Sequence, residues 1–246
     1  MFIDVHCHLD ICKDIIKTVE DARKVGVGII VASGINVETN RKVLDLAFRF
    51  KEVRAALGVY PTDALKMNEN EINKEINFIR KNDNKIVAIG EVGMDFKEDL
   101  ENLDIQKEIF EKFIDLAIEL NKPIIVHSRK VEKECIEILE KKKIKKVVMH
   151  CFSGRFSSVK KIAGNSWFLS IPTNVKYTKQ FQNIVQKIDI KNLLCETDSP
   201  FLHPEKNGQN TPKNVIESYK KIAELKGLEL EEIEETIERN YKRLFE

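Results

Sequence analysis

The stretch Phe2–Asp10 reads FIDVHCHLD, in which a short run of apolar and β-branched residues leads directly into two histidines. A run of this kind is typical of a buried parallel strand. In an open doubly wound sheet, the first strand is normally followed by a glycine-rich phosphate loop. Here His6-Cys7-His8 occupies that place, which favours a parallel architecture of another kind.

Seven further runs of this kind follow, each succeeded by a segment of helical period. They are VGIIVAS (Val27–Ser33), VRAALGVY (Val53–Tyr60), KIVAIGE (Lys85–Glu91), PIIVHS (Pro123–Ser128), KKVVMHC (Lys145–Cys151), SWFLSI (Ser166–Ile171) and NLLCETD (Asn192–Asp198). Strict alternation of strand and helix predicts parallel pairing with crossover helices. Eight such units in 246 residues favour an α/β fold, a (β/α)8 TIM barrel in which residues 1–246 form a single domain. A doubly wound sheet is the alternative.

Three of the intervening segments show helical periodicity clearly. Apolar residues recur three or four positions apart in Glu69–Arg80, in Leu103–Leu120 and from Leu230 to Leu244, which is the pattern of amphipathic helices. Pro212 stands where a further helix can begin.

The composition narrows the class of protein. With 41 basic and 40 acidic side chains the net charge is +1, which argues against a protein that coats polyanions. Five cysteines without CxxC spacing indicate reduced thiols. No uncharged stretch reaches the roughly 20 residues of a membrane span, and the N-terminus lacks the basic region of a signal peptide. We therefore expect a cytoplasmic protein with no membrane association and no obligate protein partner.

Polar residues fall at the ends of the predicted strands, where a barrel carries its chemistry. Four of the five histidines in the chain lie there, together with two carboxylates. The six residues are His6, His8, Glu91, His127, His150 and Asp198. This placement predicts a metal site.

Each of these residues also has a plainer interpretation. Side chains two apart on a strand point the same way, so His6 and His8 can converge on one cation, although a lone HxH also occurs in polar turns. His127 or His150 alone would more often be a hydrogen-bonded core histidine. Glu91 can belong to a buried ion pair, and the Asp-Ser-Pro sequence at Asp198 also suits a turn. The shared position at strand ends favours the metal interpretation.

Four imidazoles and two carboxylates exceed what one tetrahedral zinc needs, and they suit two divalent cations bridged by a carboxylate. Imidazole-rich ligation favours zinc, manganese, cobalt or nickel over magnesium. Which metal is bound then depends on which of them is available to the protein. The implied reaction is hydrolysis by a water that the metals acidify.

Several ordered motifs resemble those of the TatD-type metal-dependent deoxyribonucleases of the amidohydrolase superfamily. They are DVHCHLD (Asp4–Asp10), AIGEVGMDF (Ala88–Phe96), KPIIVHSR (Lys122–Arg129), HCFSG (His150–Gly154) and CETDSPFL (Cys195–Leu202). The resemblance spans nearly the whole chain. It implies a TIM barrel, dependence on divalent metal and hydrolysis of phosphodiester bonds in DNA.

The resemblance also implies roles for individual residues. His6, His8, Asp198 and a bridging Glu91 would hold one metal, while Glu91, His127 and His150 would hold the other. Glu91 and Asp198 would be the catalytic residues, with Asp198 as the general base. Asp95 would orient a ligand from behind, or would cap the start of a helix.

Two segments depart from the family pattern. Tyr60 in Gly58–Pro61 replaces the histidine of the usual GxHP, and a tyrosine is a poorer metal or proton partner near neutral pH. Gln209 in Gly208–Pro212 stands near the place of the arginine in an RNxP-like motif, which removes a bidentate phosphate donor. Arg129, Arg155 and Lys176 are the candidates for substrate phosphate contacts.

Three functions from different classes are compatible with these residues. The first is a two-metal phosphodiesterase that acts on DNA or another phosphodiester. The second is a small-molecule amide or ester hydrolase, such as an aminoacyl-ester hydrolase, and the third is a catalytically silent binding barrel. Many amidohydrolases have a carbamylated lysine where Glu91 stands here, which favours the first; intact candidates at all six positions disfavour the third.

Overall fold

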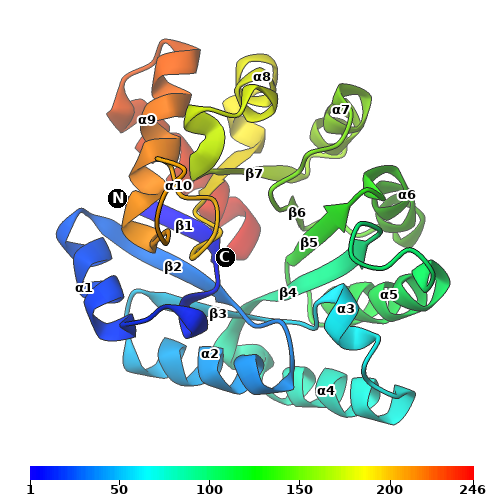
Figure 1. Cartoon of the computed structure of the whole chain (residues 1–246). Coiled ribbons are helices and arrows are strands. Elements are labelled where there is room, and N and C mark those ends of the chain that lie inside the picture. The colour runs from blue at the N-terminus through cyan, green and yellow to red at the C-terminus, as the bar shows by residue number, and fades with distance from the viewer.

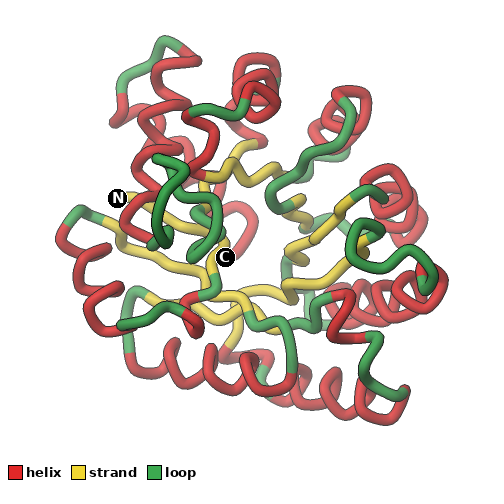
Figure 2. The backbone as a smooth tube through the Cα atoms, in the orientation of Figure 1, coloured by secondary structure: helices red, strands yellow, loops and turns green.

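The eight predicted strands form one parallel sheet with the order β1 to β8, in a computed structural model that describes all 246 residues. The strands are β1 (Phe2–Cys7), β2 (Val27–Ser33), β3 (Val53–Leu57), β4 (Ile86–Asp95), β5 (Ile124–Arg129), β6 (Val147–Met149), β7 (Phe168–Pro172) and β8 (Leu193–Glu196). The helices form an outer ring around the strands (Figures 1 and 2). The predicted (β/α)8 barrel is confirmed.

Each strand is followed by at least one helical segment. The α-helices are α1 (Ile15–Lys24), α2 (Val37–Arg49), α3 (Pro61–Ala64), α4 (Glu69–Lys81), α5 (Leu103–Glu119), α6 (Glu132–Lys142), α7 (Phe156–Gly164), α8 (Lys179–Lys187), α9 (Val215–Lys226) and α10 (Leu230–Phe245). Short 3-10 helices are η1 (Leu9–Ile11), η2 (Asp83–Lys85), η3 (Thr173–Lys176), η4 (Ile190–Asn192) and η5 (Pro212–Asn214). No helix is both long enough and apolar enough to cross a membrane.

Polar contacts join β8 to β1 and close the ring. The carboxylate of Asp4, fully buried in β1, accepts hydrogen bonds from the backbone N–H and the hydroxyl of Thr197 at 2.9 and 2.6 Å. The N–H of Asp198 donates to the carbonyl of His6 at 3.0 Å, and the N–H of His8 donates to Ser199 at 2.7 Å. The closure therefore binds the segment after β8 directly to the two histidines that follow β1.

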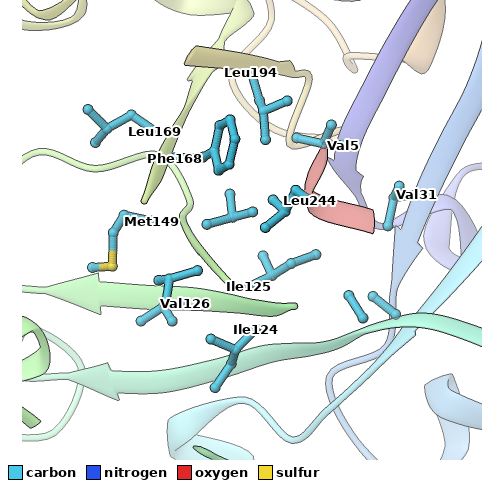
Figure 3. Close-up of a cluster of buried hydrophobic side chains, with 14 of the residues drawn as sticks. Val5, Val31, Ile124, Ile125, Val126, Met149, Phe168, Leu169, Leu194 and Leu244 are labelled. Atoms are coloured by element: carbon cyan, nitrogen blue, oxygen red, sulfur yellow. The ribbon is translucent and has the colours of Figure 1, made fainter. Parts of the chain in front are cut away.

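The hydrophobic core draws side chains from all around the barrel. Figure 3 shows Val5 of β1, Ile125 of β5 and Leu194 of β8 in one cluster, with Leu244 of α10 among them. The apolar face predicted for the C-terminal segment thus packs α10 against the strands.

Most predicted strands differ from the structure by one or two residues at an end, and two differ by more at their carboxyl ends. The run predicted to end at Glu91 continues to Asp95, because the pairing of β4 with β5 shifts register between Ile89 and Val92 and then resumes. Such a bulge re-aims side chains beside a site. The run predicted to extend to Tyr60 stops at Leu57, and Pro61 takes the first position of α3, where its missing N–H costs nothing.

Candidate metal centre

The six candidate ligands, contributed by five strands, meet at the carboxyl end of the barrel. They are His6 in β1 and His8 just after it, Glu91 in β4, His127 in β5, His150 just after β6 and Asp198 just after β8. Asp198 adopts a φ of 53°, a left-handed conformation that aspartate tolerates better than most residues. The chain turns there and aims the carboxylate back at β1.

Glu91 lies between two pairs of imidazoles. Its Oε2 is 3.5 Å from Nε2 of His6 and 3.4 Å from Nε2 of His8. Its Oε1 is 3.0 Å from Nδ1 of His127 and 3.3 Å from Nε2 of His150. Oδ1 of Asp198 completes the first side, at 3.5 Å from Nε2 of both His6 and His8. The two oxygens of one carboxylate thus face two separate groups of nitrogen atoms.

Two sets of three residues can each hold a metal ion, because within each set the possible ligand atoms all lie within 4.8 Å of one another. One consists of His6, His8 and Asp198, and the other of His6, Glu91 and His150. The first agrees with the grouping that the resemblance implies, whereas the second contains His6 where that grouping has His127. His127 reaches the site through its contact with Glu91.

In each imidazole, the ring nitrogen that points away from Glu91, here called the outer nitrogen, contacts an oxygen atom that orients the ring. Nδ1 of His6 is 3.0 Å from the hydroxyl of Ser33, and Nδ1 of His8 is 3.3 Å from the carbonyl of the same residue. Nε2 of His127 is 2.9 Å from Asp95, and Nδ1 of His150 is 3.2 Å from Glu196. When the outer nitrogen donates, the inner nitrogen of a neutral imidazole keeps its lone pair for a cation.

The contacts of Asp95 are compatible with both interpretations of its position. Its Oδ1 accepts the backbone N–H groups of Lys97 and Glu98 at 2.8 and 2.9 Å, as a cap of the turn would. Its Oδ2 faces Nε2 of His127 and accepts the hydroxyl of Tyr60 at 2.9 Å. Tyr60 therefore sits on the outer side of His127, away from the Nδ1 that points to Glu91.

Glu196 was not among the sequence candidates. It is fully buried in β8, where it accepts the hydroxyl of Ser170 at 2.6 Å and the backbone N–H of Cys151 at 2.9 Å in addition to facing His150. The signal was present, because an acid at the end of the apolar run LLCE is as costly to bury unpaired as Glu91 after KIVAIG.

Two glycines allow close backbone approaches between strands at the site, Gly58 to Glu91 and Gly93 to His127. A Cβ added to Gly58 would lie 2.6 Å from the backbone oxygen of Glu91, and one added to Gly93, whose φ is 146°, would overlap the backbone oxygen of His127. Only glycine fits these close approaches, so both positions shape the site without contributing a functional group.

The carboxylates and imidazoles of the site shift one another's pKa values. Burial raises the pKa of Glu91, but the facing histidines, His150 first among them, outweigh burial and hold that pKa well below its usual value. Burial lowers the pKa of His8, but its hydrogen bond to Asp198 and the charge of Glu91 raise the pKa to about 9. For His6, burial and the charge of His150 lower the pKa. The carboxylates thus attract positive charge, either as protons on imidazole or as a cation.

The donor set fits divalent metal. Nε2 of His6 is buried, has no hydrogen-bond partner and lies between two carboxylates. A buried nitrogen without a partner is costly, and a cation at this point would satisfy it. Nitrogen and carboxylate oxygen atoms are ligands suited to zinc, manganese, cobalt or nickel.

A cavity of about 620 Å³ opens over the centre. Five of the six candidate ligands line it, all except the more deeply buried His6. Of the candidate phosphate-binding residues, Arg129 lines the cavity, with Nη1 3.7 Å from Glu98. Arg155 is exposed at the start of α7 and does not line it. Lys176 is held by the carboxylates of Glu205 and Glu217 instead.

The chain is similar to known proteins over nearly its whole length. The family model described as TatD related DNase matches residues 3–246. A metal-dependent hydrolase from Methanocaldococcus jannaschii, itself described as uncharacterized, is 37% identical over 99% of this chain and 96% of its own. The human deoxyribonuclease TATDN3 is 32% identical over 99% of this chain and 94% of its own. The crystal structure of the TatD homolog YJJV from Escherichia coli superposes with a TM-score of 0.93 at 25% identity, over 99% of this chain and 97% of that one.

Metal affinity is expected to rise with pH. Burial opposes protonation of His8, His127 and His150, but the adjacent carboxylates outweigh it and raise all three pKa values. Protons therefore occupy the metal-free site at neutral pH, and a cation must displace them. Calorimetric titration with Mn²⁺ should show proton release and an affinity that grows by about one log unit per pH unit for each proton displaced. An affinity independent of pH between about pH 6 and pH 8 would contradict this assignment.

Replacing Tyr60 by phenylalanine is expected to leave the metal content unchanged, because the hydroxyl of Tyr60 contacts only the outer nitrogen of His127 and the carboxylate of Asp95. Turnover should fall roughly threefold to tenfold through loss of one hydrogen bond to a carboxylate. Tyr177→Phe, which removes a hydroxyl that donates to a backbone oxygen elsewhere, is the control. Loss of one metal ion from Tyr60→Phe in elemental analysis would show that Tyr60 is itself a metal ligand.

Proposed function

The chain belongs to the family of TatD-related DNases, and on that premise we propose that it hydrolyses phosphodiester bonds of DNA with two bound divalent cations. The observation that carries the proposal is the placement of Glu91, whose two carboxylate oxygens face separate groups of imidazoles. A bridging carboxylate of this kind is how two-metal hydrolases hold their cations a few Å apart.

The residues divide between two positions. His6, His8 and Asp198 would hold one cation, and His127 and His150 the other, with Glu91 shared. Divalent cations at these positions would polarise the phosphoryl group and lower the pKa of an attacking water. Zinc, manganese, cobalt and nickel suit the imidazoles best, and magnesium is the oxygen-preferring alternative.

Asp198 is the residue we assign to accept the proton of the attacking water. Burial raises the pKa of Asp198, but the adjacent imidazoles of His6 and His8 outweigh burial and hold that pKa below its usual value. The carboxylate is therefore ionised at neutral pH, lines the cavity and can take up a proton there. The hydrogen bond from its own N–H to the carbonyl of His6 keeps it in place during the transfer.

Arg129 is the side chain best placed to bind a substrate phosphate, because it alone of the three candidates lines the cavity. Its weak 3.7 Å contact with Glu98 leaves the guanidinium free to turn to a stronger partner. The run Lys141–Lys146, although the most basic in the chain, spans the end of α6 and the loop before β6, and thus lies on the face opposite the metal centre.

The direct test loads metal-stripped protein with manganese, zinc or magnesium and offers it single- and double-stranded DNA, RNA and aminoacyl esters. Cleavage of DNA that requires the added metal is the expected result. Preferential turnover of an aminoacyl ester would favour the ester-hydrolase alternative, and full activity after exhaustive chelation would exclude a metal mechanism.

Glu91→Ala is expected to abolish hydrolysis and to lower the number of bound metals while the barrel stays folded. No other carboxylate faces both groups of imidazoles, so none can replace it. Elemental analysis and DNA cleavage would be measured on protein shown to be folded by circular dichroism. Near-normal turnover in the folded variant would refute the two-metal mechanism.

Arg129→Ala is expected to weaken DNA binding and to flatten its dependence on salt. Each lost phosphate contact should reduce the slope by about 0.7 to 0.9 log units per log unit of salt. The matched control replaces Lys141, Lys142 and Lys143 by glutamine, which should change neither quantity. If the lysine variant loses affinity while Arg129→Ala does not, DNA binds the other face of the barrel.

A further inference from the structure

The mouth of the cavity has a polar wall and an apolar wall. Ser128 and Arg129 of β5 line one side. Ile11 of η1, together with Phe201 and Leu202 of the segment after β8, lines the other. In a ring of eight strands β5 lies opposite β1, and β8 adjoins β1. The apolar wall therefore faces Arg129 across the metal centre.

Phe201 exposes an apolar side chain beside the candidate metal centre. It is 54% exposed, and Ile11 on the same wall is 46% exposed. The ring of Phe201 meets the ring of His8 edge-on, with centroids 6.0 Å apart. Large apolar groups exposed within a concave site are characteristic of ligand-binding surfaces.

The segment that carries Phe201 is held rigidly. The side chain of Asn210, which is fully buried, donates to the carbonyl of Thr197 at 2.8 Å and to that of Leu202 at 3.3 Å. The N–H of Phe201 itself donates to the carbonyl of Asp198 at 2.9 Å. The backbone that carries the ring is thus held relative to the proposed general base, so binding a ligand there would require little ordering of the chain.

We propose that Phe201 is a base-stacking residue: the nucleobase next to the scissile phosphodiester stacks on its ring while Arg129 binds the backbone on the opposite wall. The inference rests on the proposed function and deepens it. The wall starts at His8 and Asp198, so its occupant lies next to the group at the metal centre. In DNA that occupant is the base, a flat π system that stacks on an aromatic ring whatever the sequence.

The test compares two short single strands of equal length, one of thymidine nucleotides and one whose sugars carry no base. Wild-type protein loaded with manganese should cleave the thymidine strand about tenfold more efficiently than the abasic strand, in line with the energy of one base stacked on an aromatic ring. Phe201→Ala should remove most of this preference while cleavage of the abasic strand stays nearly constant. Phe201→Trp should preserve it, and Phe201→Leu, which is apolar but has no π face, should not.

The matched control is Phe48→Ala, which removes a 91% exposed phenylalanine of α2 that does not line the cavity. It should leave the base preference unchanged. If Phe201→Ala slows both strands equally, Phe201 only shapes the metal centre and the inference is overturned.

A second measurement separates the inference from the proposed function. Binding of the two fluorescently labelled strands to chelated protein, followed by anisotropy, requires no turnover. Loss of the thymidine preference in Phe201→Ala supports the stacking role even if neither strand is cleaved, an outcome that would refute the nuclease function alone. Equal binding of both strands by the wild type would overturn the stacking role, whatever the protein cleaves.

Discussion

The buried negative charge of Glu91 is the constraint around which this barrel is organised. A carboxylate at 2% exposure is destabilising unless it is paired, and no lysine or arginine forms an ion pair with it. Imidazoles that β1, β5 and β6 carry to their carboxyl ends supply the partners instead. The same arrangement that stabilises the charge also suits the binding of cations. The attraction between Glu91 and its imidazoles therefore serves both the stability of the fold and the metal site.

The imidazoles can serve this charge only because their rings are fixed from behind. Ser33, Asp95 and Glu196 come from β2, β4 and β8, so the orienting oxygens are spread around the barrel just as the ligands are. Closure of the ring therefore matters to the chemistry as well as to the fold. Asp4, by joining β1 to the segment after β8, holds His6 and Asp198 in a fixed relation.

Local patterns in the chain predict most of the fold. Alternation of apolar runs with helical periods is encoded residue by residue, which is why the barrel and helices such as α4 and α5 agree closely with the predicted ranges. The bounds of β4 were wrong, because its extension to Asp95 depends on pairing with β5 across a register shift. Short 3-10 segments such as η1 were not predicted either, since they arise where loops pack against neighbouring elements.

The sequence by itself determined which residue types stand at the strand ends, because parallel strands in a barrel present those ends on one face. It could not determine which atoms meet there. Only the tertiary structure brings Tyr60 to Asp95, 35 positions apart, and Glu196 to His150. It also turns Lys176 away toward two glutamates while leaving Arg129 at the cavity. Side-chain partners across a barrel depend on strand register and loop packing, which no local pattern records.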